Sequence, residues 1–126
     1  MIVDIIKEKD FEEKVLNSEG ITIARFFGGW CGPCKMESTI LSQINDPKYQ
    51  NIKIYDLDVD KCKDLTHKYG VMTVPTLIIF KDGAELDKIA GFRNQKQLTE
   101  IFDMYCDLEK YAKLCLFFCF KTSRSN

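Results

Sequence analysis

The sequence predicts an α/β fold, in which a mixed β-sheet carries helices on both faces. Strand-like and helix-like segments alternate along the chain, as they do in β-helix-β units. A Lys-Asp-Gly turn at 81–83 follows an apolar strand, which indicates an antiparallel hairpin with the segment after the turn. With 126 residues, of which 45% are hydrophobic, the chain is long enough for one domain with its own core.

The first part of the chain is expected to form a helix, a strand and a second helix. Apolar residues recur at helical intervals over 10–16, and a polar run that ends in Gly20 closes this helix. Residues 21–27 are β-branched and aromatic, which favours a mostly buried strand. After two glycines, a helix with proline in its first turn is expected over 33–44. It stops before the Asn-Asp-Pro run at 45–47.

The second part repeats this alternation and then adds the hairpin. Residues 52–58 predict a strand, and residues 60–69 predict a short helix that a glycine closes. Residues 76–80 form an apolar strand, and residues 85–90 are expected to pair back with it. From Asn94 onward, apolar residues at helical spacing predict a final amphipathic helix.

Composition and charge exclude several classes of protein. A formal net charge of -1 gives no reason to expect nucleic acid or an anionic membrane surface as a partner. The N-terminus lacks the basic segment of a signal peptide. The longest apolar run, 114–120, is far shorter than the roughly 18 residues that cross a bilayer. We therefore expect a soluble, cytoplasmic protein with no membrane span.

Cys31 and Cys34 form a C-x-x-C motif where a strand gives way to a helix. Unpaired N–H groups at a helix N-terminus favour an anion, so Cys31 is expected to supply the attacking thiolate. Cys34 lies one turn further in and suits the resolving role, while Pro33 restrains the loop. A zinc half-site or a structural disulfide is the alternative, but zinc needs further ligands and His67 is the only histidine.

Pro75 precedes the apolar strand 76–80, and a proline is tolerated there only at the start of the strand. Two interpretations remain open. A trans proline would simply begin the strand. A cis proline would place a tight turn against the cysteine pair and leave the backbone of Val74 free to dock a substrate strand. The sequence does not decide between these isomers.

Four motifs, in their order and spacing, resemble the thioredoxin family: Trp-Cys-Gly-Pro-Cys-Lys-Met at 30–36, Val-Pro-Thr at 74–76, Phe-Lys-Asp-Gly at 80–83, and Gly91. The resemblance covers about residues 1–105, and the residues between the cysteines make it specific. It implies a central mixed five-stranded sheet flanked by four helices, with the redox pair at the start of the second helix. We therefore expect a thioredoxin domain over 1–105 and a C-terminal extension over 106–126.

The resemblance also implies an activity, that of a general protein-disulfide reductase and electron carrier with no cofactor or metal. A thioredoxin reductase would recycle it, and disulfide-containing proteins would be its substrates. Cys31 would attack and Cys34 would resolve, with Pro75 beside them. The implied substrate groove consists of Trp30, Gly32, Pro33, Val59, Val74, Ala90 and Gly91.

Two charged positions are among the departures from the family pattern. Family members usually carry a buried aspartate six residues before the first cysteine, which assists proton transfer at the resolving thiol, whereas this chain has Arg25. A family position that often holds lysine beside that aspartate is Asp56. We predict a swapped ion pair, in which Asp56 takes part of the proton-shuttle role and Arg25 stabilises thiolates. The alternative is that Arg25 points outward and Asp56 is simply exposed.

The tail from Cys106 to Asn126 extends beyond the usual end of the fold. Its segment 114–120 is apolar all round, and Cys115 and Cys119 share one face if the helix continues. It is interpreted as a continued helix folded onto the domain, as a disordered end, or as a docking element through which the protein self-associates.

Other functions remain as alternatives. The chain could be a binding module in which redox turnover is incidental, an interpretation that the missing aspartate and the apolar tail keep open. A disulfide oxidase or isomerase is disfavoured by the Gly-Pro pair between the cysteines. Cys62 is interpreted as an inert, partly buried thiol, and His67 as a solvated helix residue.

Overall fold

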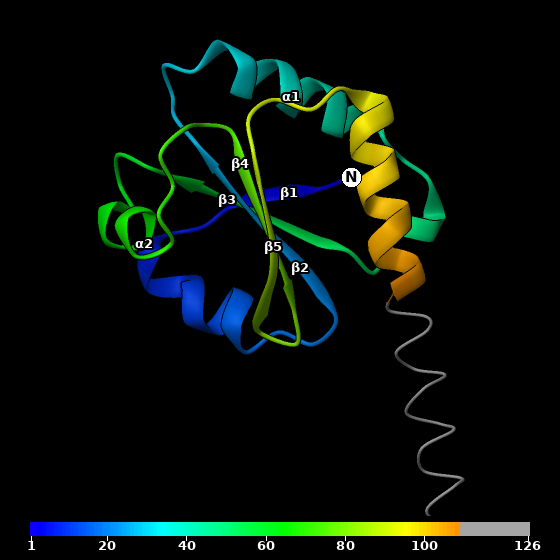
Figure 1. Cartoon of the computed structure of the whole chain (residues 1–126), viewed down its shortest axis with the longest axis horizontal. Coiled ribbons are helices and arrows are strands. Elements are labelled where there is room, and N and C mark those ends of the chain that lie inside the picture. Colours follow the sequence, from blue (N-terminus) through cyan, green and yellow to red (C-terminus); the bar gives the residue numbers. More distant parts are fainter. Residues whose placement is uncertain (109–126) are drawn as a thin grey trace, which may run out of the picture.

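Five strands form one mixed β-sheet in the order β1-β3-β2-β4-β5 (Figure 1). The computed structural model describes residues 1–108. The neighbours β1–β3 and β3–β2 are parallel, whereas β2–β4 and β4–β5 are antiparallel. The expected mixed sheet is confirmed, with β2 at its centre. The strands are β1 (Val3–Ile5), β2 (Ile21–Phe27), β3 (Lys53–Asp58), β4 (Thr76–Lys81) and β5 (Ala84–Ala90).

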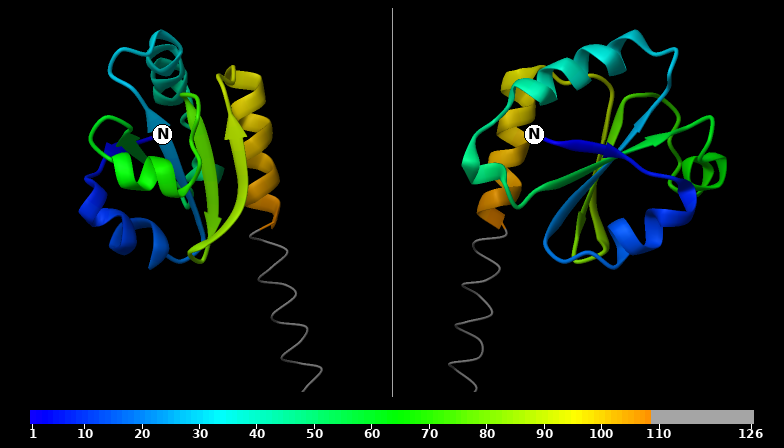
Figure 2. Two further views of the ribbon diagram at one scale, coloured as in Figure 1. Left: turned by 60° about the vertical axis from the view of Figure 1, so that its left-hand side comes forward. Right: turned by 180° about the vertical axis from the view of Figure 1, so that it is seen from behind.

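Helices cover both faces of the sheet, and Figure 2 shows this layering from two further sides. One face carries α1 (Gly32–Gln43) and the helix over 95–108. The other face carries α2 (Lys63–Lys68) and two short helical turns, Glu8–Asp10 and Glu12–Leu16. One more turn, Pro47–Tyr49, lies between α1 and β3.

The central strand β2 is buried on both faces. Ile21 and Ile23 belong to the core beneath α1, whereas Ala24 and Phe26 belong to the core beneath α2. Because side chains alternate along a strand, Arg25 shares the face of Ile21 and Ile23. This strand therefore carries a charged side chain into the layer beneath α1.

A glycine pair follows β2, and Trp30 and Cys31 lie between this pair and the start of helix α1. Cys31 is its N-cap residue, its sulfur accepts the backbone N–H of Cys34, and Pro33 lies in the first turn. A Cβ atom at Gly28 would lie 2.7 Å from the ring of Trp30, so glycine lets the ring pack on the backbone. The turn therefore places the cysteine pair at the N-terminus of α1.

The Val74–Pro75 peptide bond, directly before β4, is cis. Of the two interpretations that the sequence left open, the cis proline is the one observed. At the other end of β4, the hairpin to β5 turns through Asp82 and Gly83, which have φ values of 50° and 82°. A Cβ atom at Gly83 would lie 2.1 Å from the carbonyl oxygen of Leu16, so only glycine fits there.

No helix within residues 1–108 is long and apolar enough to cross a membrane. The final amphipathic helix is present from residue 95 as far as residue 108. The apolar segment 114–120, with Cys115 and Cys119 and the self-association predicted through it, lies outside the described residues.

Candidate active site

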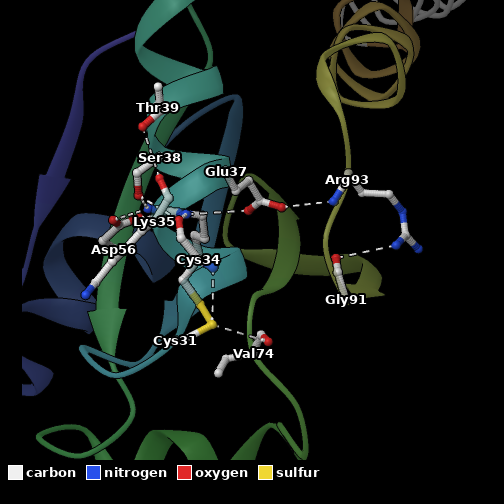
Figure 3. Close-up of polar contacts among 11 residues, drawn as sticks. Cys31, Cys34, Lys35, Glu37, Ser38, Thr39, Asp56, Val74, Gly91 and Arg93 are labelled. Atoms are coloured by element: carbon white, nitrogen blue, oxygen red, sulfur yellow. Dashed lines mark hydrogen bonds and ion pairs between the residues drawn. A yellow bond between two sulfur atoms is a disulfide. The ribbon is translucent and has the colours of Figure 1, made fainter.

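Cys31 and Cys34 are joined by a disulfide at the N-terminus of α1 (Figure 3). Their Cα atoms are 5.3 Å apart, a distance that a disulfide spans without backbone movement. The exposed fractions of the two residues are only 4% and 2%. The pair can therefore open and close in place, with the surrounding backbone already arranged for the bridge.

The surroundings of the Cys31 sulfur favour negative charge. The backbone N–H of Cys34 donates to Cys31 Sγ over 3.2 Å, and Cys31 stands at the end of α1 where N–H groups are unpaired. The carbonyl oxygen of Val74 lies 3.7 Å from the same sulfur, which places the turn at Pro75 against the pair. Once the disulfide is reduced, Cys31 is therefore suited to the thiolate form.

Several predicted groove residues lie next to the pair. Trp30 is 69% exposed, and its Nε1–H donates to Asp60 Oδ2 over 3.0 Å. Gly91, directly after β5, donates its N–H to the carbonyl oxygen of Pro75 over 2.8 Å. Ala90 is the exposed last residue of β5. These contacts connect the end of β5 to the cis-proline turn that faces Cys31.

The other predicted groove residues have different surroundings. Gly32 and Pro33 form the exposed first turn of α1. Val59 follows β3 and lines a hollow of about 410 Å³ beside α2, together with Val71 and Met72. The described contacts therefore place Val59 against α2 and do not join it to the cysteine pair.

Arg25 and Asp56 form a buried ion pair, as predicted. They are register partners on the parallel strands β2 and β3, and their exposed fractions are 1% and 6%. Arg25 Nε donates to Asp56 Oδ1 over 2.8 Å, and Nη2 donates to Oδ2 over 2.7 Å. The alternative of an outward arginine is wrong, because the side chain follows the alternation of β2 into the core.

The same guanidinium also contacts α1, at Cys34 and Ser38. Arg25 Nη1 donates to the carbonyl oxygen of Cys34 over 3.2 Å, and Nη2 donates to Ser38 Oγ over 2.5 Å. Ser38 Oγ in turn donates to the Cys34 carbonyl oxygen over 3.0 Å. Arg25 therefore places a positive charge next to the backbone of Cys34.

Glu37 belongs to the same cluster, and our sequence interpretation missed it. The residue is fully buried, its Oε1 lies 3.5 Å from Arg25 Nη1, and its Oε2 accepts the backbone N–H of Arg93 over 3.1 Å. A signal was available, because Cys34, Glu37 and Leu41 share one helix face and the outer two are apolar. A charged residue on such a face, opposite an arginine in a buried strand, indicates a buried ionic contact.

Burial and charge act in opposite directions on this cluster. Burial raises the pKa of Glu37 above its ordinary value, and the N–H of Arg93 and the charge of Arg25 only partly oppose this. Burial alone would lower the pKa of Arg25, but Asp56 and Glu37 together raise it above its ordinary value. Arg25 therefore stays charged, and Asp56 accepts two hydrogen bonds from it.

Cys62 and His67 are not part of this cluster. Cys62 is buried against the α2 face, and its burial raises the pKa of its thiol, which makes it a poor nucleophile. His67 lies exposed on α2. Among residues 1–108, no group of three or more His, Cys, Asp or Glu side chains could hold a metal ion.

The mixed sheet, the cysteine pair at a helix N-terminus and the facing cis-proline turn define a protein that carries out dithiol–disulfide exchange. Comparisons with known proteins agree with this class. The thioredoxin family model matches residues 2–104. The chain belongs to the thioredoxin family.

Two curated thioredoxins illustrate this relationship. Thioredoxin of Bacillus subtilis is 36% identical over 101 residues, which is 80% of this chain and 97% of that protein. Thioredoxin of Staphylococcus aureus is 37% identical over 105 residues, or 83% of this chain and 99% of that protein. The crystal structure of a Malassezia sympodialis thioredoxin superposes with a TM-score of 0.73 at 25% identity. That match covers 83% of this chain and 91% of the other. The chain is a disulfide oxidoreductase.

Proposed function

We propose that the protein is a general protein-disulfide reductase and electron carrier, in which Cys31 attacks and Cys34 resolves. The observation that carries this proposal is the position of Cys31 Sγ. It accepts the N–H of Cys34 at the start of α1, and its partner sulfur is within bonding reach. A thiolate is favoured at Cys31, and the second thiol is held where it can displace a bound substrate.

The proposed reaction has two exchange steps. The Cys31 thiolate attacks one sulfur of a substrate disulfide, the substrate S–S bond breaks, and the other substrate sulfur leaves as a thiolate and takes up a proton. Cys34 then loses its proton and attacks the Cys31 sulfur, which releases the second substrate thiolate. Two electrons have passed to the substrate, and the Cys31–Cys34 disulfide observed in the structure has formed.

The residues around the pair support distinct roles in this scheme. The exposed ring of Trp30, the first turn of α1 and the backbone at Val74, Ala90 and Gly91 form the proposed substrate groove. We assign Pro75 to the positioning of the Val74 carbonyl group beside Cys31.

The partners and the compartment follow from the same proposal. A thioredoxin reductase returns the disulfide to the dithiol, and the substrates are proteins with accessible disulfides. A reducing cytoplasm fits this role, since it maintains the dithiol form. Neither nucleic acid nor a membrane is part of this assignment, and the formal net charge of -1 is consistent with that.

Reduction of insulin by the protein, with NADPH and a thioredoxin reductase, tests the proposal. We expect catalytic turnover by the wild type and none by Cys31→Ser. Cys34→Ser retains the attacking thiol, so it should accumulate a mixed disulfide with the substrate. Absence of turnover with an active reductase would favour the binding module, in which the groove holds a partner without reducing it.

The reduction potential of the Cys31–Cys34 couple separates a reductase from an oxidase. Equilibration against dithiothreitol or glutathione is expected to give a value close to about -270 mV, which is the known value for thioredoxin itself. A value between about -180 and -120 mV, as in isomerases and oxidases, would contradict the assignment as a reductase.

A further inference from the structure

Glu37 lies between the helix that carries the cysteines and the loop that follows β5 (Figure 3). Its Oε2 accepts the backbone N–H of Arg93 over 3.1 Å, and its Oε1 faces Arg25 Nη1 at 3.5 Å. The carboxyl group has no exposure to solvent. Burying a carboxyl group costs a large desolvation free energy. We therefore ask which parts of the structure the contacts of Glu37 hold together.

The 91–93 loop that Glu37 contacts is also connected to the cysteine pair from the other side. Arg93 Nη1 donates to the carbonyl oxygens of Phe92 and Gly91 over 3.0 and 3.4 Å, which folds the side chain back on its own loop. The N–H of Gly91 donates to the carbonyl oxygen of Pro75 over 2.8 Å. The loop is therefore held at two points, one on the cis-proline turn and one on α1.

These contacts form a closed ring around the disulfide. The ring runs from Cys34 along α1 to Glu37, across to the 91–93 loop, back to Pro75, and through the Val74 carbonyl oxygen to Cys31 Sγ. Among the described hydrogen bonds, the one from the N–H of Arg93 to Glu37 is the one that closes this ring between α1 and the loop. Arg25 forms an ion pair with the other oxygen of the Glu37 carboxyl group.

We propose that Glu37 is a positioning residue for protein substrates: its buried carboxyl group anchors the 91–93 loop to the redox helix and so sets the groove in which a substrate chain docks beside Cys31. This inference rests on the proposed function, because it assumes that the groove receives the substrate backbone. Glu37 touches neither substrate nor sulfur and acts through the N–H of Arg93.

The chemistry of the anchor predicts which substitutions preserve it. The bond from the N–H of Arg93 needs an oxygen acceptor at residue 37, and it does not need a full negative charge. Glu37→Gln retains an acceptor of the same length. Glu37→Leu has a similar volume and no acceptor, so it leaves the Arg93 N–H unpaired. The charged groups around Glu37 are Arg25 on β2 and Asp56 on β3, and the backbone N–H of Arg93 is its hydrogen-bond donor.

A comparison of two substrates measures the effect on docking. Fully reduced wild type and variants are mixed with insulin or with dithiobis(nitrobenzoic acid), and the second-order rate constants are recorded under single-turnover conditions without a reductase. The small aromatic disulfide needs only access to Cys31, whereas an insulin chain needs the groove. We expect Glu37→Leu to lower the ratio of the insulin rate to the small-disulfide rate on the order of fivefold. Glu37→Gln should stay within about twofold of the wild-type ratio.

Two further measurements separate anchoring from a general structural effect. Hydrogen exchange at the Arg93 N–H should be about tenfold faster in Glu37→Leu than in Glu37→Gln, because only the former lacks the acceptor. Thr39→Ala is the matched control on the exposed face of α1. It removes a hydrogen bond to the Lys35 carbonyl oxygen and should leave the rate ratio unchanged.

The proposal is overturned if Glu37→Leu leaves both the ratio and the Arg93 exchange rate unchanged. It is also overturned if Glu37→Gln lowers the ratio as much as Glu37→Leu, since charge and not the acceptor would then be responsible. If Glu37→Leu does not fold, the rate ratio and the Arg93 exchange rate of Glu37→Gln still test the proposal. A wild-type protein that fails to reduce insulin would contradict the proposed function, while the exchange rates would still test the anchor.

Discussion

Arg25 and Asp56 face each other across adjacent parallel strands, and two hydrogen bonds of 2.8 and 2.7 Å join their side chains. The planar guanidinium group matches the carboxylate with two parallel donors, a geometry that lysine cannot provide. Asp56 therefore neutralises the charge of Arg25 while Nη1 remains directed at Cys34 and Glu37. The position of this pair beneath α1 leads to the first two predictions.

Asp56→Asn is expected to destabilise the oxidised protein by about 3 kcal/mol, because it leaves the buried Arg25 charge without its main partner. Unfolding in guanidinium chloride measures this loss. The double variant Arg25→Leu/Asp56→Leu should lose less than Asp56→Asn alone, since it buries no charge. A double variant that is the less stable of the two would contradict this account.

Asp56→Asn should also change the pH dependence of disulfide exchange. The uncompensated positive charge of Arg25 favours thiolates nearby, so the rise in exchange rate with pH is expected to move down by about one pH unit. Rates with a small disulfide between about pH 6 and 8 measure this shift. Asp103→Asn is the control, because Asp103 pairs with Lys48 on the surface and should leave the profile unchanged. An unchanged profile in Asp56→Asn would remove Asp56 and Arg25 from the catalytic scheme.

Glu37 should make the protein less stable as the pH rises. Its pKa in the folded protein is raised by burial above the ordinary value of 4.5, so the folded state holds this proton where the unfolded state has lost it. The free energy of unfolding is therefore expected to fall from about pH 4.5 upward, by at most about 1.4 kcal/mol per pH unit for this group. Glu37→Gln cannot titrate, so its stability relative to wild type should increase over this range. A constant difference between the two proteins would be inconsistent with the prediction.

The protein should also lose stability at alkaline pH, because of Tyr105. Its hydroxyl group donates to Asp87 Oδ2 over 3.1 Å, and burial together with this contact raises its pKa to about 12. Between an ordinary value of about 10 and this raised value, the folded state keeps a proton that the unfolded state loses, so stability falls as the pH increases. Tyr105→Phe should cost about 1 kcal/mol at neutral pH and reduce the alkaline slope, to which Tyr49 and Tyr69 also contribute because burial raises their pKa values. Denaturant titrations at neutral and alkaline pH measure both effects.

The regular elements that the sequence predicted well are those with strong periodicity or clear boundaries. β2, β4 and α1 lie within one or two residues of their expected bounds, because glycine or proline marks their ends. β3 also lies within one residue of its expected bounds. β1 was not predicted from its pattern, since three residues are too few to establish an alternation. β1 joins the sheet by pairing with β3, and the local sequence of β1 does not indicate this pairing.

Other differences have local causes. The expected helix over 60–69 is shorter, since α2 begins only at Lys63. The N–H groups of Lys61 and Cys62 both donate to the Asp58 carbonyl oxygen and form a turn first. In the site, the cysteine pair and the Arg25–Asp56 contact could be predicted from the sequence. The burial of Glu37 could have been inferred from its helix face, but its contact with the loop after β5 could not, because only the tertiary fold brings that loop to α1.

The packing of Trp30 on Gly28 has a practical consequence for optical measurements. The sequence contains one tryptophan, so the intrinsic indole emission comes from a single known position, directly before Cys31. That ring is 69% exposed, rests on a glycine and is held by Asp60 at its nitrogen. The protein thus carries a built-in fluorophore at the entrance to its reactive centre. Binding of a partner beside Cys31 can be followed through it without any added label.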